Sequence, residues 1–398
     1  MARRVSMPVF LALACVLFLA AACALRGEDV AVEERVLASR AGAPLRVVVF
    51  SPPNVDSLPA RSAPAVVAIP PYNIHPDGMD LIARAFASRG AVCAVPDFFG
   101  RTPAESRQRL GADSLHVLTQ DVRTVVAHLR GLACVDPDRI GTCGHSVGGT
   151  VSVLAGLADP RLRATIPIGM AADVEPGRPQ NVLFLSGLYD EMRSPAYLLD
   201  RLAANGVAER PRAGQVYGRF DRGTAVAVRI VPTTDHFVET FDPLLIRDLL
   251  DWTARALDAP RLARGALLPW WHKVSAFLFM LSLAGLYALL GGRWAAQLAE
   301  GQAGRLPAWG LLRLQALPAA GLAALVWLAG RTVPDLRLVA LYVMAALPLA
   351  QEFVSFRVRA SLGPSRDAPF RHLRAGAWIV AAVGVAMLVT FVLVHVPT

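Results

Sequence analysis

Between residues 30 and 258, short apolar runs alternate with segments in which apolar positions recur every three or four residues. The short runs are typical of strands covered by helices on both faces, and the longer segments of helices with one buried face. This alternation predicts an α/β fold with a mostly parallel, eight-stranded sheet that begins with an antiparallel pair. The expected strands are 30–38, 45–50, 65–69, 91–95, 139–143, 164–168, 182–186 and 225–231. The expected helices are 77–88, 104–132, 147–157, 195–204 and 243–257.

Longer apolar stretches flank this region on both sides. Arg3 and Arg4 precede an apolar run over residues 8–25, which is typical of an export signal or an uncleaved membrane anchor. Four apolar stretches follow Pro260 and predict an all-helical transmembrane region, with helices at about 274–292, 314–330, 338–356 and 375–396. The expected organisation is a signal peptide or anchor (1–26), an α/β domain (27–260) and a transmembrane domain (261–398).

The net charge of +9 lies in the last third of the chain, because residues 1–260 contain as many arginines as acidic residues. The excess lies in short loops between apolar runs, which is the pattern of a membrane protein and not of a nucleic-acid-binding protein. Loop 357–374 carries five arginines, whereas loops 293–305 and 331–337 carry two each. The positive-inside rule places loop 357–374 in the cytoplasm. We therefore expect an integral protein of the bacterial cell membrane whose α/β domain is extracytoplasmic.

The five cysteines form no C-x-x-C pair, so we expect buried free thiols and no metal site. Ala20–Cys23 resembles a lipoprotein processing site, although Ala20 stands where leucine is usual. Lipidation of Cys23 therefore stays an alternative to a cleaved or retained leader. Glu352 interrupts the third apolar stretch, and we expect it to reach the headgroups or pair with a loop arginine.

One stretch carries the strongest chemical signal. Gly144–Gly148 reads Gly-His-Ser-Val-Gly between a predicted strand and a predicted helix. This is the arrangement of a nucleophile elbow, in which a serine occupies a sharp strand-to-helix turn with strained backbone angles. Glycines on either side avoid the clashes that Cβ atoms would cause there. Ser146 is therefore the expected nucleophile, with the amino end of the helix directed at the oxyanion.

A serine nucleophile needs a base and a carboxylate that orients it, and in this fold they follow the serine in the order acid, histidine. Asp190 lies just beyond the predicted strand 182–186 and is the expected acid. Glu191 is the near alternative, and either residue could instead cap the helix that starts near Pro195. His236 follows the last predicted strand and precedes the last helix, which makes it the expected base.

The oxyanion needs two backbone N–H donors. Val147, directly after the nucleophile, is expected to supply one. The loop after strand 65–69 should supply the other, and Tyr72 is its first possible donor because Pro70 and Pro71 have no N–H. His145 lies inside the elbow with its ring expected to point away from substrate, and His75 could line the pocket.

Residues 30–258 resemble the dienelactone hydrolase-like branch of the α/β-hydrolase superfamily, near the cutinase-like and acetylhydrolase-like esterases. The residues that carry the resemblance are Asp136–Gly141 leading into Gly144–Gly149, Pro71-Tyr72, Pro96–Arg101, Gly187–Asp190 and Asp235–Phe237. The oxyanion turn of cutinase-like relatives reads Pro-Gly-Tyr, and Pro71 replaces its glycine here. Dienelactone hydrolases proper use a cysteine nucleophile, so Ser146 implies serine ester hydrolysis instead. Residues 261–398 resemble no family that we recognise.

The sequence thus favours a membrane-anchored serine hydrolase that cleaves a small-molecule or lipid-like carboxylic ester through an acyl-enzyme, without a cofactor. The short segment between Ile168 and Asn181 leaves no room for a large lid and suggests an open cleft. Two alternatives stay open. One is acyl transfer to a lipid-linked acceptor, and the other is a non-catalytic hydrolase fold that binds or senses a ligand. The sequence does not determine the oligomeric state.

Overall fold

The computed structural model describes residues 7–24, 30–72, 74–98, 114–175 and 177–267, together with isolated residues between 270 and 282. The chain divides into two compact units, one of residues 27–270 and one of residues 1–26 with 271–398. The second unit contains α1 (Met7–Ala24), an apolar helix at the position of the expected leader. Among the described residues, no helix combines the length and the hydropathy needed to cross a bilayer. The four expected transmembrane helices fall outside these residues, apart from isolated positions in the first.

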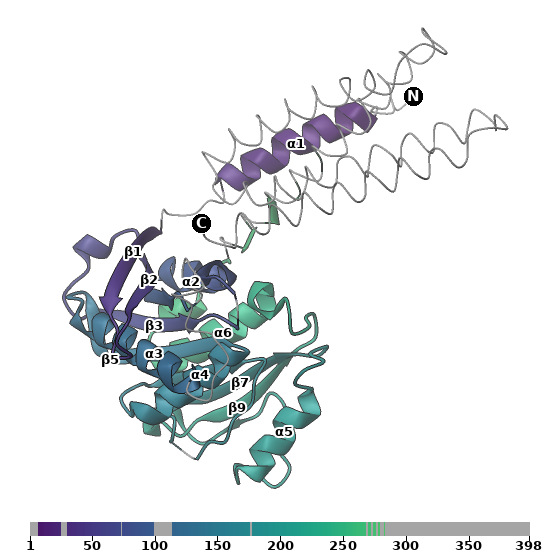
Figure 1. Ribbon diagram of the computed structural model, residues 1–398. Helices are drawn as coiled ribbons and strands as arrows, with labels where there is room; N and C mark the ends of the chain where they lie inside the picture. The colour runs from purple at the N-terminus through teal and green to yellow at the C-terminus, as the bar shows by residue number, and fades with distance from the viewer. Residues whose placement is uncertain are drawn as a thin grey trace, which may run out of the picture. The chain divides into compact units, whose positions relative to one another are not determined.

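The 27–270 unit is built on one sheet with helices packed against it (Figure 1). The strand order is β1-β2-β4-β3-β5-β6-β7-β9-β8. Strands β3, β4, β5, β6, β7 and β9 run parallel, whereas β1, β2 and β8 pair antiparallel with their neighbours. The strands are β1 (Ala31–Ala38), β2 (Pro44–Ser51), β3 (Ala63–Ile69), β4 (Val92–Pro96), β5 (Val135–His145), β6 (Ala164–Ile168), β7 (Val182–Gly187), β8 (Val216–Tyr217) and β9 (Val226–Val231).

The prediction of eight strands is wrong by one, because the described sheet has nine. The additional strand, β8, is only two residues long and pairs with the outer edge of β9. Two partly exposed residues give no periodic signal, so only the pairing reveals this strand. β5 also begins at Val135, four residues before the expected start, since its first residues pair with Ala63 across a register shift.

Helices cover both faces of the sheet. α2 (Asp80–Ala87) is preceded by a 3-10 turn, η2 (Pro76–Met79). These two elements stand where the sequence predicts a single helix over 77–88. α3 (Ser114–Gly131) is described from Ser114 onward, and the earlier part of the expected 104–132 helix lies outside the described residues. The others are α4 (Val147–Ala158), α5 (Pro195–Ala204) and α6 (Pro243–Ala256), with 3-10 turns η1 (Val55–Ser57), η3 (Phe220–Arg222), η4 (Glu239–Phe241) and η5 (Pro260–Ala263).

Alternate residues of the strands face two different cores. Leu183 and Leu185 of β7 belong to the cluster formed with α2 and α6, whereas Phe184 packs with α4 and α5. A further cluster lies between the first strands and α3. Burial on both faces explains why the parallel strands read as short, continuous apolar runs.

The register of the parallel strands brings their carboxyl ends to one edge. Ile69 of β3 pairs with Gly144 of β5, and His145 of β5 pairs with Ile168 of β6. On the other side, Gly187 of β7 pairs with Val231 of β9. The loops that leave β3, β5, β6, β7 and β9 therefore emerge at the same level, where ligands bind in open α/β sheets.

Candidate active site

Ser146 occupies the turn between β5 and α4 with φ 55° and ψ −120°, a conformation that side chains rarely adopt. Its backbone N–H donates to the carbonyl of Ile168, at 2.9 Å. The flanking glycines are required by space. A Cβ atom on Gly144 would lie 2.2 Å from the Gly148 carbonyl oxygen, and one on Gly148 would lie 2.4 Å from the Ile69 carbonyl oxygen. Glycines at both positions therefore permit the elbow conformation of the serine.

The structure brings the three expected triad residues together. Nε2 of His236 lies 3.2 Å from Oγ of Ser146, and Nδ1 of His236 lies 3.0 Å from Oδ2 of Asp190. The serine is partly exposed, whereas the histidine and the aspartate are 4% and 3% exposed. This geometry permits proton transfer from the hydroxyl to the ring, with the carboxylate orienting the ring.

Asp190 is held by its own loop. Its Oδ1 atom accepts hydrogen bonds from the backbone N–H groups of Met192 and Arg193, both at 2.8 Å, and the Ser186 hydroxyl donates to Oδ2 at 3.2 Å. The alternative acid, Glu191, is exposed. Neither carboxylate caps α5, because the Ser194 hydroxyl accepts from the N–H of Tyr197 and fills that position.

The two expected oxyanion donors lie in adjoining segments. Val147 is the first residue of α4, where a backbone N–H has no partner within the helix. A Cβ atom on Gly148 would also lie 2.6 Å from the Pro70 carbonyl oxygen, so the loop leading to Tyr72 runs directly against the elbow. The Tyr72 side chain is 40% exposed.

His75 belongs to a different cluster. Its Nε2 atom lies 2.8 Å from Nη2 of Arg46, and its Nδ1 atom lies 3.2 Å from Oδ2 of Asp77. Arg46 in turn pairs with the buried carboxylate of Asp97, at 2.6 Å. The neighbours of the His75 ring are therefore charged side chains that do not belong to the expected triad.

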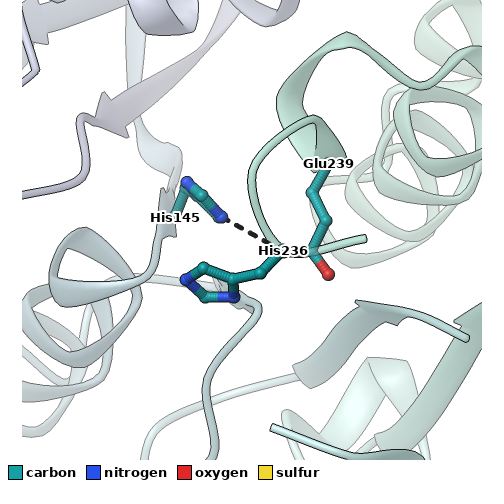
Figure 2. A group of neighbouring side chains, drawn as sticks. All are labelled: His145, His236 and Glu239. Atoms are coloured by element: carbon teal, nitrogen blue, oxygen red, sulfur yellow. Dashed lines mark ion pairs between the residues drawn. The ribbon is translucent and has the colours of Figure 1, made fainter. Parts of the chain in front are cut away.

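Sequence reasoning missed one buried carboxylate, Glu239, which lies in η4 three residues after His236. Its Oε1 atom accepts a hydrogen bond from the N–H of Gly187, at 2.6 Å, and its Oε2 atom lies 3.2 Å from Nε2 of His145. The His145 ring lies against the His236 ring with centroids 4.8 Å apart. Figure 2 shows the His145 side chain meeting those of His236 and Glu239, which come from one loop. In the sequence, Glu239 is only an acidic residue three positions after His236, and nothing else there points to a cluster with His145.

Glu239, His145 and His236 also have the composition of a metal site, with one donor atom of each within 4.8 Å of the others. All three are buried. Both ring nitrogens of His236 already contact Asp190 and Ser146, so a metal ion there would compete with those contacts.

Cys143 and a cleft along α6 and η5 do not fit a role in the chemistry of this site. Cys143 lies three residues before Ser146, but it is wholly buried, and burial raises the pKa of its thiol well above the ordinary value. A cleft of about 560 Å³ lies along α6 and η5, and its lining contains no triad residue. It is lined by residues that include Leu183, Arg229, Asp248, Trp252 and Arg264.

The strand order, the elbow after β5 and the loops at the carboxyl edge define an α/β-hydrolase fold. Residues 45–173 match the profile of the Dienelactone hydrolase family, which supports a hydrolase. This match includes the elbow and ends before Asp190 and His236.

A curated relative, the acyltransferase drtE of Aspergillus calidoustus, is 29% identical over 110 residues, which are 27% of this chain. The matched part spans about a third (35%) of that relative's length.

Similar solved structures cover 57% of this chain. They include a Klebsiella pneumoniae protein assigned as a dienelactone hydrolase (16% identity, TM-score 0.42, 99% of that chain). A serine hydrolase without a lid from Xanthomonas campestris gives 20% identity, a TM-score of 0.39 and coverage of 94% of that chain. A cold-adapted esterase from an Arctic intertidal metagenomic library gives 15% identity, a TM-score of 0.40 and coverage of 95% of that chain.

Proposed function

We propose that this protein is a serine hydrolase that cleaves a carboxylic ester through Ser146, His236 and Asp190. The single observation that carries the proposal is the continuous contact from the Ser146 hydroxyl through both nitrogens of the His236 ring to the Asp190 carboxylate. Side chains from three loops far apart in the sequence meet in the order that general-base activation of a serine requires.

In the proposed reaction, Nε2 of His236 takes the proton of the Ser146 hydroxyl as Oγ bonds to the carbonyl carbon of the ester. The resulting imidazolium is stabilised by Asp190 and gives its proton to the departing alcohol, which leaves an acyl-enzyme. Water then loses a proton to the same nitrogen and attacks the acyl carbon. Collapse of the tetrahedral intermediate formed in this way releases the acid, and the proton on His236 returns to Ser146.

The negative charge that forms on the carbonyl oxygen needs donors that are already in place. We assign this role to the backbone N–H groups of Val147 and Tyr72. The first lies at the amino end of α4, and the second lies in the loop packed against the elbow. Each such donor contributes on the order of 3 kcal/mol to stabilisation of the transition state.

The surroundings of the triad favour an apolar or lipid-like ester. Large apolar side chains are exposed on each of the three loops that carry Asp190, His236 and the proposed oxyanion donor. They include Tyr72, Ile74, Leu188, Tyr189, Met192, Phe237, Val238 and Phe241. Such side chains can bind an acyl chain or a lipid-like alcohol that water solvates poorly.

Acyl transfer is the second candidate, and the acyltransferase relative is the observation that favours it. Hydrolysis and transfer share the acyl-enzyme and differ only in whether water or an alcohol attacks it. An added alcohol acceptor therefore separates them. Acyl transfer predicts an ester product formed in preference to the free acid when the acceptor is far more dilute than water, whereas hydrolysis predicts mainly free acid under that condition.

We further propose that the domain works at a bacterial membrane, on the extracytoplasmic side. The support is the sequence pattern: an apolar leader, apolar stretches after residue 260 and an arginine-rich loop at 357–374. The test is expression in a bacterial host, followed by alkaline extraction of membranes and protease treatment of spheroplasts. The proposal requires a chain that resists extraction and a hydrolase domain that is digested from outside. Complete release by alkali contradicts it.

The test of the enzymatic proposal uses the full-length protein in detergent and p-nitrophenyl esters of increasing acyl length. The wild-type protein is compared with Ser146→Ala. We expect substitution of the serine to reduce kcat by about 10⁴-fold or more, because the nucleophile itself is removed. Equal rates for the two folded proteins on every ester would rule out serine ester hydrolysis and favour the binding-module alternative.

A further inference from the structure

Glu239 contacts all the segments that carry the proposed triad. It lies three residues after His236, its carboxylate accepts from Gly187 three residues before Asp190, and it faces His145, the neighbour of Ser146. The side chain is 0% exposed, which is rare for a glutamate without a specific role.

His145 lies between Glu239 and the proposed base. The His145 ring lies against the ring of His236, with a centroid separation of 4.8 Å and an angle of 40° between the planes. Nε2 of His145 and Oε2 of Glu239 are 3.2 Å apart but are not aligned as a hydrogen bond. Because both atoms are buried, a small rotation that aligns them would remove the cost of leaving them unpaired.

Gly169, just after β6, packs closely against the side chains of Glu239 and His236. A Cβ atom there would lie 2.4 Å from Oε2 of Glu239 and 2.9 Å from Nδ1 and Cε1 of His236. The backbone of Gly169 therefore lies directly against both side chains, and only glycine fits this position.

We propose that Glu239 is a positioning residue for the triad. It connects the three triad-bearing segments and places a second carboxylate behind His236, which becomes positively charged when it accepts the serine proton. This inference rests on the proposed serine hydrolase function. In a buried site a carboxylate this close stabilises the imidazolium far more than it would in water.

The alternative role for Glu239 is purely structural, namely to satisfy the buried N–H of Gly187. Glu239→Gln distinguishes the two roles, because glutamine keeps the volume and an oxygen for Gly187 but loses the negative charge. A structural role alone predicts an unchanged enzyme. A positioning role predicts a lower kcat with an unchanged KM and an unfolding temperature close to that of the wild type.

The experiment measures how fast a fluorophosphonate probe labels Ser146 in the full-length protein. The reaction reports activation of the serine by His236 and needs no knowledge of the natural ester. We expect labelling of Glu239→Gln to be about 100-fold slower than wild type, because the charge that stabilises the imidazolium is lost. Hydrolysis of p-nitrophenyl acetate and butyrate should lose kcat by the same factor on both esters.

A second pair of variants covers the case in which Glu239→Gln fails to fold. Gly169→Ala introduces the clash with Glu239 and His236. Gly206→Ala is its control, because φ is +69° at Gly206 and +60° at Gly169, so both variants carry the same kind of backbone strain. The new Cβ atom at position 206 has nothing within 4 Å. We expect slow labelling in the first variant and wild-type labelling in the second.

Labelling of folded Glu239→Gln at the wild-type rate overturns the inference and leaves the proposed function intact. If Glu239→Gln does not fold, equal labelling of the two glycine variants overturns it in the same way. Failure of the probe to label the wild-type protein overturns the proposed function, and the inference with it.

Discussion

Nδ1 of His236 lies 3.0 Å from Oδ2 of Asp190, although 46 residues separate them in the sequence. The aspartate is fixed from the other side by the backbone N–H groups of Met192 and Arg193. A histidine ring oriented by a carboxylate in this way presents its other nitrogen to Ser146 in the form that can accept a proton.

The first prediction concerns the identity of the acid. Asp190→Asn should reduce kcat on p-nitrophenyl esters by about 10⁴-fold, because an amide can hold the ring in the wrong tautomer and does not stabilise the imidazolium. Glu191→Gln is the matched control, since this neighbour is exposed and its kcat should equal that of the wild type. A larger loss in Glu191→Gln than in Asp190→Asn would transfer the role to the alternative acid.

The second prediction tests the proposed backbone donor at Tyr72. Tyr72→Pro removes the N–H and should reduce kcat by about 100-fold or more relative to Tyr72→Ala, which keeps it. Tyr72→Ala itself should mainly raise KM for long acyl chains, because only an exposed side chain is lost. Similar kcat values in the two folded variants would exclude this N–H as an oxyanion donor.

The third prediction concerns stability and pH at the ion pair between Arg130 of α3 and Asp159, which follows α4. Burial alone would raise the pKa of Asp159, but hydrogen bonds from the Arg130 guanidinium and the Arg161 backbone N–H outweigh it and leave this pKa below its ordinary value. A depressed folded-state pKa adds stability above the unfolded pKa of about 3.9, and that stability is lost as the pH falls through the folded value.

Asp159→Asn should therefore lower the free energy of unfolding at pH 7 by about 1 kcal/mol, with a smaller difference below pH ~3. Urea unfolding at both pH values measures this. Asp221→Asn serves as the control, because its pair with Arg219 is exposed and should contribute nothing measurable. A deficit in Asp159→Asn that persists unchanged at low pH would show that the pair is not its source.

The fourth prediction concerns the thiols of the α/β domain. Burial raises the pKa of both the Cys93 and the Cys143 thiol, and both side chains are wholly buried. Iodoacetamide at pH 8 should therefore leave both unmodified in the native protein and modify both after unfolding in guanidinium. Cys134, which is partly exposed, should react first. Mass spectrometry of the digested protein gives the result, and modification of Cys143 without loss of the native fold would contradict it.

Much of this domain follows from local features of the sequence. Strands such as β3 and β4 are apolar on both faces, so their runs are visible without any knowledge of their neighbours. The elbow is local as well, because the glycines that permit it lie within two residues of Ser146. The order of nucleophile, acid and base along the chain, with each directly after a predicted strand, then indicates Asp190 and His236 before any distance is known.

Other features depend on which segments become neighbours. β8 exists only because two residues pair with the edge of β9. The hydroxyl of Ser194 caps α5, a role that the sequence left open as an alternative for Asp190 or Glu191. Glu239 is an ordinary acidic residue in the sequence. It is buried between His145 and Gly187 because the carboxyl ends of β5, β7 and β9 lie at the same edge of the sheet. The sequence thus determined eight of the strands, the elbow and the order of the proposed triad, because these depend on adjacent residues. Only the tertiary structure decided which residues lie against the proposed triad, because that depends on contacts between residues distant in the chain.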